Sequence, residues 1–530
     1  MKSILAGLLA VSTALSAAPL PAEERVDLET ITRIREEGFR NSNVMQLASE
    51  LTDGIGPRLT GSPNLKRANE WARQKLASWG LSNARLESWG PFGRGWEYEQ
   101  SAVRMLSPDV AELLALPEAW TPGTGGAVRG KAVRVTAANP DELEKFKGKL
   151  AGRIVFFGDP PDPKLENAQA ERYDAKALEE LFEFQIEPGP RQVNREVYRK
   201  RREQRNAATR FFAGEKALAV VSPSRRDGVL TVQAAGSWRT GEEPSPVPSL
   251  VMAVEHFGRI ARLLDRGIDV ELELDVRAKF LDGDPMQVNT LAELPGTDKK
   301  GEIVMLGAHL DSWHAGTGAT DDGAGVVATM EAMRILKALG VSPRRTIRIA
   351  LWTGEEQGLL GSRAYVAAHF ATRPEPTDPE QKKLPEWRRK PTWPISVKPE
   401  HAKLAAYFNL DNGAGRVRGI YAEKNAAVVP VFESWIAPLK DLGVTTITMR
   451  DTTGSDHESF DGVGLPGFQF IQDELQYEGW THHTNLDTFE RLPPKDLMQA
   501  SVVIACFVWQ AAMRDGMLPR KPVPQEPAKR

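Results

Sequence analysis

From about Met286 onward, the chain alternates short apolar runs with longer amphipathic stretches, as expected of an α/β domain. The runs at 303–306, 346–352 and 404–409 have the length and composition of buried strands, and 325–339 has the pattern of a helix. His, Asp or Glu residues follow closely after each of these three strands. Because sites in open α/β sheets gather beyond the carboxyl ends of strands, we expect these side chains to meet at one edge.

Five short segments carry the polar groups with the greatest capacity to bind metal. Together they offer two imidazoles and three carboxylates as ligands, and one further carboxylate for acid/base chemistry. This set fits zinc, which binds His and Asp/Glu in catalytic sites and leaves positions open for water. Each segment alone has an ordinary structural explanation, so the prediction depends on their combination. The segments are Gly307–Asp311, Thr320–Gly325, Gly354–Gly358, Asn409–Gly413 and His482–Asp487.

The first two segments offer a ligand with an orienting partner, and a pair of carboxylates at a helix start. His309 can bind metal through one ring nitrogen while Asp311 accepts the other N–H. A buried His satisfied by a neighbouring Asp is the alternative. Asp321 and Asp322 open a helix, where an Asp cap would be ordinary. The glycines that follow also permit close approach to a cation, and one carboxylate can bridge two metals about 3.5–4 Å apart.

The remaining segments contain an acidic pair, a single aspartate and two adjacent imidazoles. Glu355 and Glu356 repel each other, so burying both requires a cation or a proton. Their side chains diverge on an extended backbone, so one can bind metal while the other faces the bound water. Asp411 is equally compatible with a turn. His482 and His483 lie in a polar loop, for which a plain surface position is the alternative.

The composition is that of a soluble globular protein with more than one domain. The chain has 530 residues, too many for one ordinary core, with 41% hydrophobic and 26% charged residues. A net charge of −3 gives no broad basic field, so we expect no nucleic-acid partner. The single cysteine, Cys506, excludes an intrachain disulfide and lies in an apolar stretch, where it is expected to be a core residue.

The N-terminus has the pattern of a secretory signal peptide. A short charged start, Met1–Ser3, precedes an apolar run to about Ala18 that ends in small residues. A buried or membrane helix is the alternative, but the run is too short and too rich in Ala and Ser to span well. We therefore predict a signal peptide at 1–18, a secreted or periplasmic protein, and no membrane association after cleavage.

The region from about 106 to 280 has a different pattern, in which short strands alternate with turns. A highly charged piece at 166–210 interrupts it and is expected to form a solvated, helical excursion. Strands are predicted at 153–158, 217–221 and 249–252, and a helix at 255–266. Elsewhere the pattern predicts helices within 28–79 around a loop at 54–64, a surface loop at 373–400, and a disordered tail after 519.

The order of the five segments resembles that of the secreted co-catalytic di-zinc exopeptidases, which include bacterial leucyl aminopeptidases, plasma glutamate carboxypeptidase and glutamate carboxypeptidase II. The resemblance covers Asp53 to the final helix and includes the loop at 56–62. It implies a central mixed, mostly parallel sheet flanked by helices. The strand-rich region is similar to an inserted, β-rich protease-associated domain. The implied domains are 25–105 and 281–518 for the zinc peptidase, 106–280 for the insert, and 519–530 for the tail.

The resemblance also implies a role for each matching residue. Two Zn²⁺ ions per chain are expected, with Asp321 as the carboxylate that bridges them, and the Asp321–Asp322 peptide is often cis in this family. Glu355 matches the general base, and Asp311 matches the carboxylate that orients the first ligand. His457, Tyr477 and His482 are expected near the substrate. The metal ligands implied are His309, Asp321, Glu356, Asp411 and His483.

The activity implied is hydrolysis of peptide bonds by a metal-bridged hydroxide, with an aminopeptidase as the first expectation. A carboxypeptidase or dipeptidase of the same family is the alternative, and we cannot place from the sequence the residues that would distinguish these directions. A glutaminyl cyclase with one zinc, or a receptor-like binding protein, would need fewer of the residues that are present. The insert either shapes access to the site or supports a homodimer.

Overall fold

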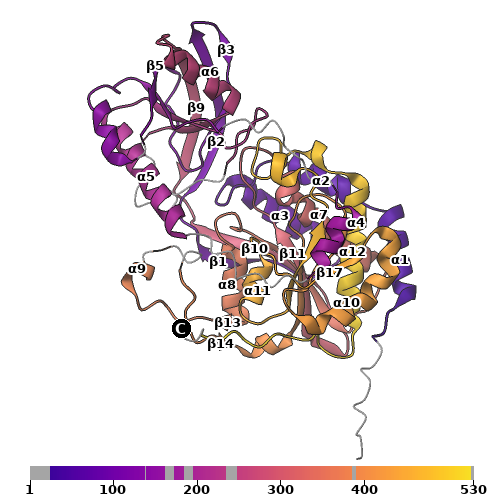
Figure 1. Ribbon diagram of the computed structural model, residues 1–530. Helices are drawn as coiled ribbons and strands as arrows, with labels where there is room; N and C mark the ends of the chain where they lie inside the picture. Colours follow the sequence, from indigo (N-terminus) through magenta and orange to yellow (C-terminus); the bar gives the residue numbers. More distant parts are fainter. Residues whose placement is uncertain are drawn as a thin grey trace, which may run out of the picture.

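The computed structural model describes residues 24–137, 139–161, 172–183, 195–233, 247–382, 384 and 389–526. Two eight-stranded sheets organise this part of the chain. In Figure 1 the second sheet stands above the first, and helices surround the first. The predicted signal peptide, 1–18, lies outside the described residues.

The first sheet is mixed and mostly parallel, which confirms the predicted α/β class. Its central strands run parallel to one another, and antiparallel pairs occur toward both edges. In order across the sheet, the strands are β1 (Ser82–Pro91), β10 (Met286–Leu294), β12 (Arg345–Trp352), β11 (Lys299–His309), β15 (Leu404–Asn409), β18 (Gly467–Gln472), β16 (Val417–Tyr421) and β17 (Thr446–Thr448).

Both faces of this sheet are covered, because alternate residues of its central strands are apolar and point to opposite sides. In β11, Val304 and Leu306 join one core, while Ile303 and Met305 join the other. The first core also takes residues from α1 (Leu28–Arg40), α2 (Val44–Thr52), α3 (Pro63–Ser78), α7 (Ala324–Ala338), α10 (Val429–Ile436) and α12 (Pro494–Met513). The second takes residues from α8 (Leu360–His369) and α11 (His457–Asp461).

Helix α12 is the central helix of the first core. By length and composition it could cross a membrane, yet 89% of its apolar window is buried inside the fold. Cys506 lies on this helix and is buried, as its apolar surroundings predict. The helix is therefore a core element of the sheet that carries the metal-binding segments.

The second sheet contains the strands predicted between 106 and 280, and it begins upstream of that range at Gly95, because β2 pairs along its length with β9. Helix α6 (Val254–Asp265) packs on one face, and α5 (Arg195–Gly214) on the other. In order, the strands are β3 (Ala111–Glu112), β2 (Gly95–Ser107), β9 (Glu271–Leu281), β5 (Val128–Val135), β6 (Ile154–Phe157), β7 (Ala219–Pro223), β8 (Ser249–Met252) and β4 (Ala115–Pro117).

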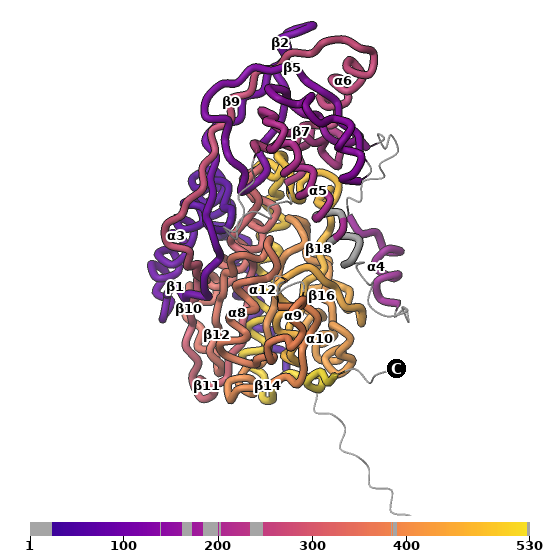
Figure 2. The backbone as a smooth tube through the Cα atoms, turned by 90° about the vertical axis from the view of Figure 1, so that its left-hand side faces the viewer, coloured from indigo at the N-terminus to yellow at the C-terminus, as the bar shows by residue number. Residues whose placement is uncertain are grey.

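Part of the charged segment is docked on the first sheet, which differs from the predicted solvated excursion. Helix α4 (Ala175–Phe182) lies beside β17 and is visible at that edge in Figure 2. Arg172, just before it, pairs with Asp473 at 3.0 Å and Asp496 at 2.8 Å. Both aspartates are buried. Buried carboxylates need compensating cations, and Arg172 adds to the charges of Arg418, which pairs with Asp473, and Arg416, which pairs with Asp496.

The C-terminal segment also differs from prediction. Where the structure describes it, the segment expected to be a disordered tail packs against the first sheet. Arg520 Nη1 donates to the His401 carbonyl oxygen at 2.8 Å, and Lys521 Nζ donates to the Glu423 carbonyl oxygen at 2.7 Å. Its basic residues satisfy backbone carbonyl groups, which the composition alone does not reveal. The last residues, 527–530, lie outside the described part.

Candidate metal centre

The first sheet brings three of the five metal-binding segments to one edge. Strand β11 lies between β12 and β15 and runs parallel to both, with His309 level with Trp352 and Gly307 level with Asn409. All three strands end on the same side. His309 and the segments that follow β12 and β15 therefore meet there, as the strand pattern predicts.

His309, Asp321 and Asp411 form the first group of close ligand atoms. His309 Nε2 lies 3.3 Å from Asp321 Oδ1 and 3.6 Å from Asp411 Oδ1. The ligand atoms of the three residues all lie within 4.8 Å of one another, and all three side chains are buried. Burial alone would lower the pKa of His309, but the carboxylates of Asp411 and Glu355 hold it well above its usual value.

The second group uses the other oxygen of Asp321. His483 Nε2 lies 2.9 Å from Glu356 Oε2 and 3.3 Å from Asp321 Oδ2. His482 adds another nitrogen, because its Nε2 lies 3.8 Å from the same Asp321 oxygen. Ligand atoms of Asp321, His482 and His483 also lie within 4.8 Å of one another. Both adjacent imidazoles therefore face the shared carboxylate.

Asp321 is held between the two groups by its own backbone. Asp487 is buried and accepts hydrogen bonds from Asp321 N at 3.3 Å and Thr320 N at 2.6 Å. The Asp321–Asp322 peptide bond is cis. Asp322 accepts a hydrogen bond from His309 N at 3.2 Å. The two oxygens of Asp321 thus face different imidazoles, which is the arrangement that a bridging carboxylate needs.

Glu355 lies beside the first group at a longer distance. Its Oε2 is 3.9 Å from His309 Nε2, and the residue is 9% exposed. Burial raises the pKa of its carboxyl group well above the usual value, and the charges of Asp411 and Glu356 add to the shift. A carboxyl group with a raised pKa can accept and return a proton near neutral pH.

The carboxylate of Asp311 lies closer to the backbone of Glu355 and Glu356 than to His309, its predicted partner. His309 Nδ1 lies 2.9 Å from the Asp311 carbonyl oxygen but 3.7 Å from its carboxylate, which was expected to orient the ring. The carboxylate accepts hydrogen bonds from Glu355 N at 3.2 Å, Glu356 N at 3.3 Å and Thr60 Oγ1 at 2.9 Å. Asp311 therefore positions the acidic pair relative to β11.

Tyr477, His482 and His457, the predicted substrate contacts, lie in two places. The rings of Tyr477 and His482 are 4.8 Å apart, so both adjoin the metal-binding groups. His457 is 1% exposed, and its Nε2 lies 3.2 Å from the Thr452 carbonyl oxygen and 3.6 Å from Glu423 Oε1. The ring of His457 therefore faces a separate buried contact with Glu423.

Arg58 is a buried cross-link that composition alone did not reveal. It is 0% exposed, and its guanidinium donates to the carbonyl oxygens of Leu310, Thr317 and Gly318 at 2.7 Å each. Burial lowers its pKa to about 10, so the group remains charged at neutral pH. Arg58 ties an N-terminal loop to the segment that leads to Asp321.

Replacing Arg58 with methionine is expected to reduce the stability by about 3 kcal/mol, because buried carbonyl groups lose their donor. The midpoint of thermal unfolding, followed by circular dichroism on zinc-loaded protein, should fall by several degrees. Arg67→Met is the matched control, since Arg67 is exposed and its hydrogen bonds, to the Gly54 carbonyl oxygen and to Asn64 Oδ1 at 3.1 Å each, lie at the surface. Equal midpoints for the two variants would contradict the proposed cross-link.

The donor set fits divalent metal ions. Asp321 Oδ2 and Glu356 Oε1 are buried and have no hydrogen-bond partner among the described residues, so they have electron pairs available to a cation. Buried carboxylates this close repel one another unless positive charge or a proton compensates. Imidazole and carboxylate groups are the ligands of catalytic zinc sites. The residues present are therefore suited to hold zinc.

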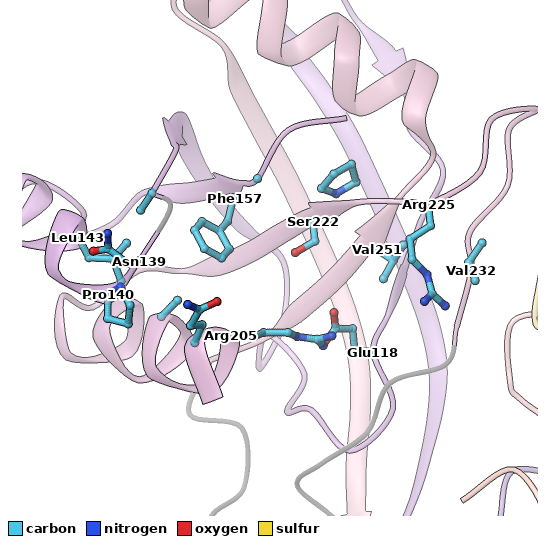
Figure 3. A pocket seen from close by; sticks show the side chains of 15 residues that line it. Glu118, Asn139, Pro140, Leu143, Phe157, Arg205, Ser222, Arg225, Val232 and Val251 are labelled. Carbon is cyan, nitrogen blue, oxygen red and sulfur yellow. The ribbon is translucent and has the colours of Figure 1, made fainter. Parts of the chain in front are cut away.

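A separate cavity of about 380 Å³ lies beside the second sheet (Figure 3), and its lining includes no residue of the metal-binding groups. Its lining includes Glu118 and Arg205, which form an ion pair. Val232, also in the lining, forms an antiparallel bridge with Thr484, the residue after His483. One residue of the cavity wall therefore pairs with the loop that carries the paired imidazoles.

Known proteins resemble the chain over both sheets. Residues 289–508 match the model of Peptidase family M28. Carboxypeptidase Q of Mus musculus is 26% identical over 472 residues, which cover 89% of this chain and 86% of that protein. A peptidase M28 precursor from Shewanella amazonensis has a TM-score of 0.64 at 25% identity, covering 94% of this chain and 99% of that one. A zinc aminopeptidase from Bacillus subtilis shares the fold, with a TM-score of 0.55 at 18% identity, covering 90% and 96%.

The match to Peptidase family M28 spans 289–508, which contains all five segments and both groups of ligand atoms around Asp321. The family resemblance seen in the sequence is confirmed, and so is the expected fold of the first sheet. The chain therefore resembles the co-catalytic zinc exopeptidases, matches peptidase family M28 over residues 289–508, and is a metallopeptidase.

Proposed function

We propose that this chain holds two Zn²⁺ ions and removes terminal residues from short peptides. The observation that carries the proposal is the position of Asp321, whose two oxygens lie 3.3 Å from His309 and 3.3 Å from His483. A carboxylate shared in this way suits one ion on each side. His309 and Asp411 would hold the first ion, and Glu356 and His483 the second.

When bound, the ions would lower the pKa of a coordinated water molecule and polarise the scissile carbonyl group. Glu355 is placed to take the proton of the attacking water and to return it to the leaving amine. Burial of Glu355, which is 9% exposed, raises the pKa of its carboxyl group and so makes its ionised form a stronger base. Asp311 accepts a hydrogen bond from Glu355 N at 3.2 Å and so fixes the backbone from which this side chain starts.

Tyr477 and His482 are the candidates for stabilising negative charge on the carbonyl oxygen in the transition state. Burial raises the pKa of Tyr477 well above its usual value, and nearby carboxylates add to the shift, so its hydroxyl stays protonated and can donate. Gly413 has a φ of +84°, and a Cβ there would lie 3.0 Å from the Tyr477 side chain. A glycine at this position therefore leaves room for the Tyr477 ring.

The direction of cleavage depends on which charged terminus of the peptide the site receives. A free carboxylate calls for Arg or Lys. Arg225 and Arg226 lie near His483. Burial lowers the pKa of His483, Asp321 raises it, and the charges of the two arginines lower it further. These cations, with the full-length similarity to carboxypeptidase Q, favour a carboxypeptidase or dipeptidase. An aminopeptidase, the first expectation from the sequence, is the competing outcome of the same test.

A panel of free, N-acetylated and C-amidated dipeptides tests both the direction and the metal dependence. C-amidation is expected to reduce kcat/KM by about 10²-fold, because the substrate loses a charge-assisted contact. Incubation with 1,10-phenanthroline should abolish hydrolysis of every substrate. Cleavage of the amidated but not the acetylated dipeptide would establish an aminopeptidase instead. Hydrolysis that survives the chelator would overturn the zinc proposal.

Metal analysis of the purified chain separates two zinc ions from the one that a glutaminyl cyclase would need. We expect two ions per chain, since both ligand groups are assembled around Asp321. We also propose export to the periplasm or the medium, on the basis of the N-terminal pattern alone. Identification of 106–280 as a protease-associated domain, and its part in substrate access or in a homodimer, is likewise proposed from the resemblance.

A further inference from the structure

Residues 226–233, here called the brace, connect β7 of the second sheet to the loop that carries the paired imidazoles. Arg226 Nη1 donates to the His482 carbonyl oxygen at 2.8 Å. Gln233 N donates to the His483 carbonyl oxygen, also at 2.8 Å. The carbonyl groups of both imidazole residues are therefore held from outside their own loop.

Further contacts extend this junction along the loop. Val232 forms an antiparallel bridge with Thr484, and Thr231 N donates to Asn485 Oδ1 at 2.7 Å. Thr231 is 0% exposed and Val232 is 6% exposed, so the junction is shielded from water. Hydrogen bonds in such surroundings are stronger than the same bonds in water. The junction behaves as a short stretch of sheet that joins the two parts of the chain.

The brace is itself fixed to the second sheet. Glu255, in the first turn of α6, accepts hydrogen bonds from Gly228 N at 2.6 Å and Val229 N at 3.1 Å. Trp480 of the imidazole loop packs against Gly228, where a Cβ would lie 3.5 Å from its ring. The position of the loop is therefore set relative to α6.

His483 has a backbone conformation that requires such support. Its φ is +62°, in the left-handed region that residues other than glycine rarely adopt. A conformation of this kind persists where the surrounding structure holds it. In this conformation the ring reaches Glu356 at 2.9 Å and Asp321 at 3.3 Å. The hydrogen bond from Gln233 of the brace therefore ends on the carbonyl group of His483, the residue with the strained backbone.

We infer that the brace holds His483 in the conformation that binds the second metal ion, so that the affinity for this ion depends on residues that do not touch it. Arg226 and Asn485 act as positioning residues for His483. The inference rests on the metal site of the proposed function. In the described part of the chain, His309 and Asp411 form no hydrogen bond with the brace, so the two ions should respond differently.

The test is a zinc titration of the full chain carrying Arg226→Met and Asn485→Ala together. Metal-free protein competes with a chromogenic chelator for Zn²⁺, which yields two dissociation constants. We expect one constant to rise by about 10- to 100-fold, as for other residues that orient a ligand, while the other changes by less than about threefold. The Arg226→Lys single variant keeps a donor and should bind the second ion more tightly than Arg226→Met.

Arg259→Met is the matched control, because it removes an exposed positive charge of α6 outside the proposed site and leaves the bond between Arg226 and the His482 carbonyl intact. Its zinc constants should stay within about threefold of the wild-type values. The thermal midpoint of each metal-free variant is measured in parallel. For the double variant a modest decrease is expected, because the buried Thr231 N–H loses its acceptor, so the difference between the two zinc constants decides the test.

Two results would overturn the inference. The first is a double variant with both zinc constants unchanged. The second is equal weakening of both ions together with a lower midpoint of the metal-free protein, since that indicates a general structural role. A wild-type chain that binds one zinc ion, or none, would contradict the proposed function instead. The two failures are therefore distinguishable in one experiment.

Discussion

Replacing Glu355 with glutamine is expected to reduce kcat by about 10²–10⁴-fold while the zinc content stays unchanged. Glutamine keeps the size of the side chain but cannot accept the proton of the attacking water. Glu355 Oε2 lies 3.9 Å from His309 Nε2, farther than the closest ligand contacts, so the ligand set should remain intact. Steady-state kinetics on a free dipeptide and metal analysis of the same samples provide the measurement.

The control for this variant is Glu490→Gln, which makes the same chemical change on the exposed surface. Its kcat should lie within about twofold of the wild-type value, as for most surface substitutions. A Glu355→Gln enzyme with nearly normal kcat would exclude Glu355 as the general base. A variant that loses zinc as well as activity would assign Glu355 to the ligands instead.

Replacing Asp321 with alanine is expected to reduce activity by at least about 10³-fold and to lower the zinc content at the same time. Asp321 is the only carboxylate in both groups of ligand atoms found among the described residues, so its loss weakens both sites. Metal ions supply several kcal/mol of charge stabilisation in the transition state, and each 1.36 kcal/mol is a factor of ten in rate. Zinc per chain after dialysis, and residual activity with excess zinc, provide the measurement.

Asp141→Ala serves as the control for Asp321→Ala, because Asp141 is exposed on the second sheet's side of the molecule. It should retain both its zinc and its activity. Full zinc content and normal activity in Asp321→Ala would show that the carboxylate does not bridge the ions. The two large predictions therefore differ in their metal readout: Glu355→Gln keeps zinc, whereas Asp321→Ala loses it.

The convergence of the proposed ligand positions could be predicted from sequence, because each position depends on a local pattern. His309, Glu356 and Asp411 lie at or just after apolar runs, and parallel strands bring such positions to one edge. Asp321 lies at the start of a helix after a glycine-rich segment, so the local structure around it could also be predicted. The strands and helices of both sheets follow from periodicity and from turn residues in the same way.

Contacts between distant segments could not be predicted. Asp311 was expected to hold His309, but its carboxylate binds backbone groups of Glu355 and Glu356, whose direction depends on the folded turn. Arg58 looked like one polar residue of a Gly/Pro loop, yet it is fully buried between carbonyl groups. Polar side chains are recruited by unsatisfied groups elsewhere in the chain, and sequence spacing carries no record of such partners.

The docking of α4 shows the same limit. Its charged composition predicted a solvated helix, and that would be correct for an isolated segment. Two buried aspartates, Asp473 and Asp496, lie several hundred residues away and attract Arg172. The composition of a surface segment therefore does not predict its docking where buried carboxylates elsewhere in the chain bind one of its cations.

The position of α12 has a consequence for how the protein is made. This helix supplies the middle of the first core, yet it follows every strand of the first sheet in the chain. It also contacts the region of α1, since Trp509 Nε1 donates to Asp27 Oδ2 at 3.0 Å and Asp27 caps α1. Contacts between residues so far apart in sequence are slow to form. The first sheet thus remains without its central helix until α12 has been synthesised, so nascent chains must stay protected from aggregation until then.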